Sequence, residues 1–183
     1  MRIIAGKYGG IRLNPVKGDQ TRPTTDKVKE AIFSMVGPYF SGGVFLDLFA
    51  GSGAVGLESV SRGMDEAVLV DRSSKAIKAI KDNILKIKTP DAFKVIKGTA
   101  SQVLDRLSAQ QYNFQMVFLD PPYKEQKIVE NIKQIVKLNL LKTDGLIICE
   151  VDNNTVLPDN IGNLESIKKK NYGLTNLLIY QLK

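Results

Sequence analysis

The feature that most constrains the fold of this chain is a regular alternation of strand-like and helix-like segments from residue 44 onward. Five apolar runs are typical of buried strands, and they cover residues 44–48, 67–71, 93–97, 115–120 and 146–151. Stretches with helical spacing lie between them, near residues 53–62, 74–87, 100–108 and 126–140. This alternation predicts an α/β protein with an open, mostly parallel sheet and helices on both faces.

The two ends of the chain follow other patterns. Residues 164–170 and 174–182 flank a turn of Asn, Tyr and Gly, which predicts an antiparallel hairpin at the edge of the sheet. Residues 1–43 read as an extension, with a β-hairpin near the start and a helix across 24–38. A length of 183 residues fits one domain, so we expect residues 1–183 to combine this extension with a core at 44–183.

A glycine-rich loop follows the first strand and opens a helix. Glycines let a backbone pass close beneath a ligand where side chains would collide. The pattern Gly51-x-Gly53-x-x-Gly56 matches the dinucleotide-binding fingerprint, and Asp71 ends the next strand, where a ribose-binding acid is expected. The loop by itself therefore leaves NAD and S-adenosylmethionine both open as ligands.

The acid before this loop favours one of the two ligands. Asp47 stands four residues before Gly51, which suits a ligand that carries an amino-acid ammonium group. NAD has no such group, whereas S-adenosylmethionine does. A Walker A site is excluded because no Gly-Lys-Ser/Thr follows the loop. We therefore expect S-adenosylmethionine as the cofactor.

The most specific signal is the tetrad Asp120-Pro121-Pro122-Tyr123 after the fourth strand. Two prolines fix a stiff, extended turn and remove two backbone donors, so the carbonyls become fixed acceptors. An exocyclic amine on a base is a poor nucleophile, because its lone pair is delocalised into the ring. Acceptance of its two N–H groups by Asp120 and Pro121 would direct that lone pair at a methyl donor. Tyr123 would stack on the base, worth about 1–3 kcal/mol.

The composition agrees with such a mechanism. The chain has no histidine, so His-based triads and His metal ligands are excluded, and positioning by acceptors needs no strong general base. The lone cysteine, Cys149, excludes an internal disulfide, and we expect no metal. Because no apolar stretch is long enough to span a bilayer and residues 1–13 lack the apolar segment of a signal peptide, we expect a cytoplasmic location.

Taken together, the loop and the tetrad resemble the class I amino-methyltransferases that act on DNA and RNA. The segments Arg-Ile-Ile-Ala-Gly at 2–6, Gly-x-Arg-Leu at 10–13 and Thr-Arg-Pro-Thr-x-Asp at 21–26 narrow this to the RsmD family of bacterial 16S rRNA guanine-N2 methyltransferases. The resemblance implies a Rossmann-like, seven-stranded sheet with an antiparallel last strand. It also implies one guanine of 16S rRNA as the target, in a small subunit that is at least partly assembled.

The resemblance also assigns roles to residues. It implies that Asp47, Gly51 and Gly53 hold the methionine part of S-adenosylmethionine and that Asp71 holds the ribose. The stretch at 98–100 should border the adenine, where many relatives carry an acid and this chain has Thr99 and Ala100. The expected cofactor-binding set is Asp47, Phe49, Ala50, Gly51, Ser52, Gly53, Asp71, Arg72, Thr99 and Ala100.

The charge of the chain favours a polyanionic partner. The net charge is +7, and residues 1–30 contain seven Lys or Arg against three Asp or Glu. Lys75, Lys78 and Lys81 recur on one helix, which we interpret as a solvated face. In the extension we expect RNA contacts, with Tyr8 in the same basic wall. The residues expected to bind RNA are Arg2, Lys7, Arg12, Arg22, Thr24 and Lys27.

Three alternatives stay open at this point. A DNA adenine-N6 methyltransferase uses the same tetrad, but it usually carries a target-recognition domain, for which this chain has no long insertion. An NAD enzyme would leave the tetrad unexplained. A non-catalytic nucleic-acid-binding protein on a methyltransferase scaffold would not need both motifs complete.

Overall fold

The computed structural model describes residues 1–18, 24–122 and 127–183, and a large central sheet dominates this part of the chain. Eight strands are hydrogen-bonded there in the order β3-β2-β1-β4-β5-β8-β7-β6. Their bounds are β1 (Val44–Asp47), β2 (Glu66–Asp71), β3 (Phe93–Lys97), β4 (Phe114–Leu119), β5 (Leu141–Asp152), β6 (Asn160–Ile161), β7 (Leu164–Tyr172) and β8 (Thr175–Leu182). Strands β1 to β5 pair in parallel, and β8 lies antiparallel between β5 and β7.

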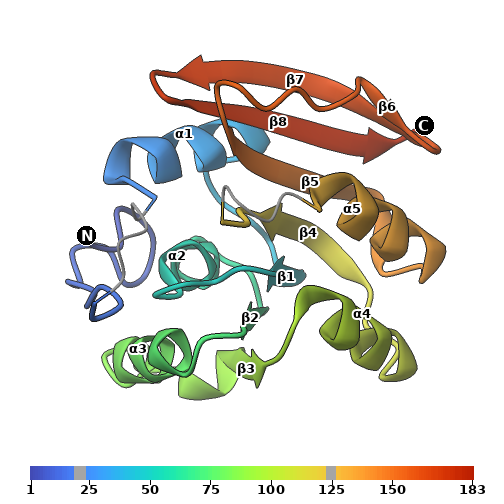
Figure 1. Ribbon diagram of the computed structural model, residues 1–183. Helices are drawn as coiled ribbons and strands as arrows, with labels where there is room; N and C mark the ends of the chain where they lie inside the picture. Colours follow the sequence, from blue (N-terminus) through green and yellow to red (C-terminus); the bar gives the residue numbers. More distant parts are fainter. Residues whose placement is uncertain (19–23, 123–126) are drawn as a thin grey trace.

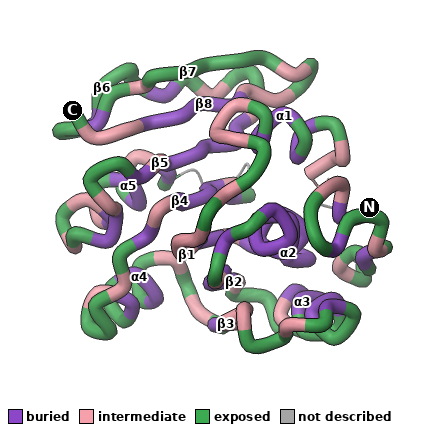
Figure 2. The backbone as a smooth tube through the Cα atoms, turned by 180° about the vertical axis from the view of Figure 1, so that it is seen from behind, coloured by how far each residue is buried: buried purple, intermediate pink, exposed green. Residues whose placement is uncertain are grey.

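Helices cover both faces of the sheet (Figure 1). Helices α1 (Asp26–Val36), α2 (Ala54–Ser61) and α3 (Ser74–Ile84) lie on one face, and α4 (Ala100–Ala109) and α5 (Ile128–Lys137) lie on the other. The short 3-10 turn η1 (Pro90–Ala92) leads into β3. Each face has its own apolar cluster, and the central strands between them are buried (Figure 2). No helix in the described ranges is long and apolar enough to cross a membrane.

The sheet confirms the predicted fold class, with two differences in detail. The mostly parallel core, the antiparallel last strand and the hairpin after residue 163 are present as predicted. The sequence patterns missed the two-residue strand β6, which pairs with the start of β7. The patterns also overestimated the N-terminal hairpin, which consists of one isolated bridge between Arg2 and Arg12.

The N-terminal hairpin is short because its backbone donors bond to helix α2 instead. The N–H groups of Ile4 and Ala5 donate to the carboxylate of Glu58, at 2.7 Å and 3.0 Å. The Lys7 N–H donates to the carbonyl of Ser61 at 2.7 Å. A β ladder needs these groups for cross-strand bonds. Residues 1–13, named here the N-terminal arm, are therefore anchored to α2 as well as to each other, and one of their own backbone bonds runs from the Ile3 N–H to the carbonyl of Ile11 at 2.9 Å.

The strand order places the site. Strand β1 has β2 on one side and β4 on the other, so the direction of the connections reverses there. In open α/β sheets, ligands bind at this switch point, beyond the carboxyl ends of the strands. The glycine loop follows β1, the acid-proline turn follows β4, and both motifs therefore lie on the same rim, side by side.

Candidate active site

The backbone of the glycine loop requires its glycines. Gly51 and Gly53 have φ angles of 53° and 80°, in the left-handed region that disfavours other residues. A Cβ added to Gly51 would meet no atom within 4 Å, whereas one added to Gly53 would lie 2.8 Å from Leu57 Cδ1. Gly53 is thus needed for packing, and Gly51 faces open space on the rim of the sheet.

Asp47 is a buried acid with an unsatisfied oxygen. The residue is 1% exposed, and its Oδ1 atom has no hydrogen-bond partner among the described residues. Burial raises the pKa of Asp47 to about 8, although the backbone N–H groups of Phe49 and Gly56 oppose this rise. A buried acceptor without a partner is costly unless a ligand completes it. The ammonium group of S-adenosylmethionine fits that requirement.

Asp71, the predicted ribose-binding acid, has a local structural role. Its Oδ2 atom accepts the N–H of Gly51 at 2.9 Å, and its Oδ1 atom accepts the N–H of Ser73 at 2.8 Å. The acid therefore holds the glycine loop and the start of α3 at once. Each carboxylate oxygen has a further lone pair, so these bonds still allow ribose hydroxyls to donate to Asp71.

The remaining cofactor candidates divide into two groups. Arg72 is exposed next to Asp71, and Thr99 and Ala100 start α4 on the same rim, where the Gly98 N–H bonds to the carbonyl of Asp71 at 3.1 Å. The second group is the loop residues Phe49, Ala50 and Ser52, which make contacts with other parts of the protein. Phe49 packs against the α4–α5 cluster, and Ala50 is buried. The carbonyl of Ser52 accepts Asn83 Nδ2 at 3.0 Å.

The acid-proline turn begins directly after β4. Pro121 is buried and Pro122 is exposed, whereas Tyr123 lies outside the described residues, so its stacking role stays a prediction. Burial raises the pKa of Asp120 well above its usual range, and the negative charges of Glu150 and Asp47 raise it further. The three acids are therefore close enough to repel one another.

Sequence reasoning missed Glu150. Strand β5 pairs Cys149 with Leu119 of β4, so the next residues, Glu150 and Asp120, lie beside each other. Glu150 is buried, and its Oε2 atom accepts a hydrogen bond from Thr24 Oγ1 at 3.2 Å. Burial raises the pKa of Glu150 to about 7. The available signal was an acid within the apolar run Leu-Ile-Ile-Cys-Glu-Val at 146–151.

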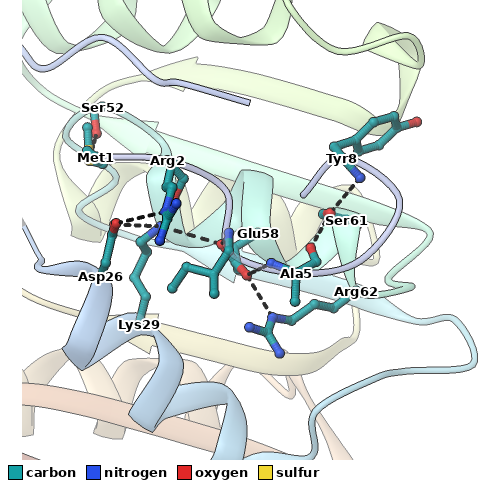
Figure 3. A network of polar contacts seen from close by, with 11 residues as sticks. Met1, Arg2, Ala5, Tyr8, Asp26, Lys29, Ser52, Glu58, Ser61 and Arg62 are labelled. Atoms are coloured by element: carbon teal, nitrogen blue, oxygen red, sulfur yellow. Dashed lines mark hydrogen bonds and ion pairs between the residues drawn. The ribbon is translucent and has the colours of Figure 1, made fainter. Parts of the chain in front are cut away.

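Buried charges fix the N-terminal arm beside the site (Figure 3). The carboxylate of Glu58 accepts Arg62 Nε at 2.8 Å and lies 3.4 Å from Lys29 Nζ, and all three residues are buried. Lys29 belongs to α1, and Thr25 caps the start of that helix. This network therefore holds α1 in the position that brings Thr24 to Glu150.

The predicted RNA-contact residues differ in how accessible they are to a partner. Arg2, Lys7, Arg12 and Lys27 are exposed, whereas Arg22 lies outside the described residues. The Thr24 side chain is directed at Glu150 in the site and not at the outer surface, where RNA would bind. Tyr8, expected in the same basic wall, lies beneath the surface with Lys7 Nζ 5.4 Å from the centroid of its ring. Tyr8 is 5% exposed, and its hydroxyl forms a 2.6 Å hydrogen bond with Thr89, because a buried phenol needs a polar partner.

The sheet order, the antiparallel last strand and the loop after β1 define the class as Rossmann-like methyltransferase proteins. The model of the family described as "Conserved hypothetical protein 95" matches residues 1–181. "Putative rRNA methyltransferase YlbH" of Bacillus subtilis is 44% identical over 99% of this chain and 98% of its own. "Ribosomal RNA small subunit methyltransferase D" of Escherichia coli is 30% identical over 99% of this chain and 89% of its own.

A solved structure agrees with these sequence relatives. "Putative methyltransferase yhhF from Escherichia coli" has a TM-score of 0.83 and 31% identity, and the match covers 100% of this chain and 98% of that one. The chain belongs to this family, the RsmD family.

Proposed function

We propose that this protein uses S-adenosylmethionine to methylate the exocyclic N2 of a guanine in 16S rRNA, within a small subunit that is at least partly assembled. One observation carries the proposal. The loop with the unsatisfied Asp47 and the turn with Asp120 follow neighbouring parallel strands, so a cofactor and an amine can meet there. The names of the relatives support rRNA as the substrate. Such a substrate also agrees with a cytoplasmic location.

Named residues would hold the cofactor. The Oδ1 atom of Asp47 would accept the ammonium group, and the backbone at Gly51 leaves room for the methionine part. Asp71 would accept the ribose hydroxyls, and residues 98–100 would border the adenine from the start of α4. When bound, S-adenosylmethionine supplies an electrophilic methyl group on a sulfonium.

The protein's part in the reaction is to position the amine. The Asp120 carboxylate and the Pro121 carbonyl would accept the two N–H groups of guanine N2, which localises the nitrogen lone pair. To bring its amine to Asp120 and Pro121, the guanine must leave its stack. The half-buried position of Asp120 strengthens each hydrogen bond that it accepts, because less water competes there than at the surface.

Basic residues on the same side supply RNA affinity. Lys7, Arg12 and Lys27 are exposed on the arm and on α1, next to the elements that carry the site. Lysine and arginine displace counterions from phosphates without reading sequence. The arm would therefore orient the rRNA, while the pocket selects the base.

A labelling experiment tests the proposal. The purified protein is incubated with radiolabelled S-adenosylmethionine and, in parallel, unmodified small subunits, free 16S rRNA or DNA. We expect N2-methylguanosine from the subunits and less from free rRNA. N6-methyladenine in DNA would instead establish the alternative enzyme. Cofactor binding in calorimetry without any methyl transfer would favour a non-catalytic binding protein.

A further inference from the structure

Glu150 is an acid without a role in the proposed methyl transfer, although it lies beside Asp120. The register of the sheet places Phe118 of β4 beside Asp47 of β1 and beside Ile148 of β5. Side chains two positions apart along a strand share a face. Phe45, Phe118 and Ile148 belong to the apolar cluster under α1, α2 and α3. Two residues further along these strands, Asp47, Asp120 and Glu150 therefore face the same side.

These three acids follow one another on adjacent strands, with Asp120 and Glu150 two residues further along the strand direction than Asp47. Asp47 is on β1, Asp120 follows the neighbouring β4, and Glu150 is on β5, one strand further from the glycine loop. If the cofactor binds at Asp47 and the target amine binds at Asp120, Glu150 lies on the far side of the amine from the cofactor. It then faces the ring atom of the base that is next to the amine. In guanine, this neighbouring group is N1–H, a donor that points the same way as the N2 amine.

The surroundings of Glu150 leave its carboxylate available to a ligand. Its carboxylate accepts a hydrogen bond from the Thr24 hydroxyl, and no cation forms an ion pair with it in the described part of the chain. The same hydroxyl also lowers the pKa of Asp120, so Thr24 lies next to both acids. A buried carboxylate without a cation is unfavourable for the folded protein alone. The position instead suits an acid that accepts hydrogen bonds from a bound ligand.

We propose that Glu150 selects guanine by accepting its N1–H, while Thr24 positions the carboxylate. Adenine has an acceptor at N1 beside its amine, so a carboxylate would repel it there. Asp120 then binds the reacting amine, and Glu150 determines whether the base that carries this amine is guanine. This inference rests on the proposed function and assigns a specificity residue to the same site.

The test compares two bases that share the amine and differ at N1. Small subunits are reconstituted with 16S rRNA that carries either guanine or 2-aminopurine at the target position located by the labelling experiment. The second base keeps the N2 amine but has an acceptor at N1. We expect the wild-type protein to favour guanine in kcat/KM by about 10- to 100-fold, the discrimination typical of one well-placed base contact.

The variant Glu150→Gln keeps the shape of the side chain but presents an amide, which can donate to the 2-aminopurine N1. We expect it to lose about 10- to 100-fold in kcat/KM on guanine and most of its preference for guanine over 2-aminopurine. Its affinity for S-adenosylmethionine in calorimetry should stay unchanged. Glu130→Gln, at an exposed position on α5, is the matched control and should keep wild-type values.

A second pair of variants checks the positioning role without altering the acid. Thr24→Val removes the hydroxyl and should weaken the preference for guanine, whereas Thr24→Ser should preserve it. A Glu150→Gln protein that keeps the full wild-type preference overturns the proposal, even if its overall rate falls. If the wild-type protein binds the cofactor but methylates no guanine, the proposed function fails with it, and the labelling experiment reports that separately.

Discussion

At the scale of single residues, the site consists of carboxylates that the fold keeps away from water. Burial raises the pKa of Asp47 to about 8 and that of Glu150 to about 7, and it raises the pKa of Asp120 as well. In the unfolded chain these groups ionise at ordinary acidic pH. The unfolded state therefore gains stability relative to the ligand-free fold as pH rises from about 4 to about 8. Above that range the folded groups are also ionised, and the effect levels off.

Asp47→Asn separates cofactor binding from stability. The variant should weaken S-adenosylmethionine binding by about 10- to 100-fold, because a charge-assisted hydrogen bond is lost. Without ligand at pH 8, it should unfold at least about 2 °C higher than wild type, since a costly buried charge is removed. Calorimetric titration and thermal unfolding across pH 5–8.5 measure both effects. Unchanged cofactor affinity would remove Asp47 from the site.

Asp120→Ala should affect turnover and spare the cofactor. Removal of a positioned acceptor of the amine should lower kcat by about 100- to 1,000-fold, the range seen when preorganised catalytic hydrogen bonds are lost. The affinity for S-adenosylmethionine should remain close to wild type, because Asp120 is placed at the amine. Single-turnover methylation of small subunits measures this, and wild-type turnover would rule out the proposed role.

The sequence predicted some of these residues and missed another for a physical reason. Asp47 and Asp120 stand in recognisable motifs, because the loop and the turn need particular local backbones. Glu150 is an acid in an ordinary strand, and its significance comes from Asp120 on β4 and Thr24 at the start of α1. The spacing of residues in the sequence does not reveal that these three side chains lie together, because the pairing of strands in the sheet brings them together.

At the scale of elements, the attachment of the N-terminal arm to α2 depends on Glu58. The sequence predicted the apolar face of α1 through Val28, Ala31 and Ile32, which are buried. It did not predict that Lys29 is also buried, because the partner that compensates its charge lies 29 residues later. The same acid accepts donors from the arm, and for that reason the predicted strands there did not form.

Glu58→Gln tests this attachment. The amide would leave buried Arg62 without an ion-pair partner among the described residues and Lys29 with Asp26 alone, so we expect a loss of about 3–5 kcal/mol in the free energy of unfolding. Urea unfolding followed by circular dichroism measures it. Glu30→Gln on the exposed side of α1 is the control and should cost less than about 0.5 kcal/mol. An equally small loss for Glu58→Gln would show that the network is not structural.

At the scale of the whole molecule, the parallel core was predictable because its signals are local. Each central strand is a short apolar run, and each helix has its own periodicity. Strand β6 was not predictable, because two residues carry no periodic pattern and pair only where β7 is already in place. The resemblance to the RsmD family supplied the antiparallel last strand, and the sheet confirms it.

The charge of the molecule should act through its N-terminal side. The double variant Arg12→Gln, Lys27→Gln should weaken RNA binding about equally for different sequences and lower the slope of log K against log salt by about 2. Fluorescence anisotropy with a 16S rRNA fragment at several salt concentrations measures this. The control is Lys78→Gln with Lys81→Gln on α3, whose lysines we interpret as a solvated face. If the α3 variant weakens RNA binding more than the Arg12 and Lys27 variant does, the RNA contacts α3 instead of the N-terminal side.

A crystal structure with S-adenosylhomocysteine tests most directly whether Asp47 and Asp120 share a methyl-transfer site. We expect the ligand's ammonium nitrogen within about 3 Å of Asp47 Oδ1, the sulfur facing Asp120, and the ribose hydroxyls at Asp71. A ligand bound away from the glycine loop, or an ammonium group with no contact to Asp47, would contradict it.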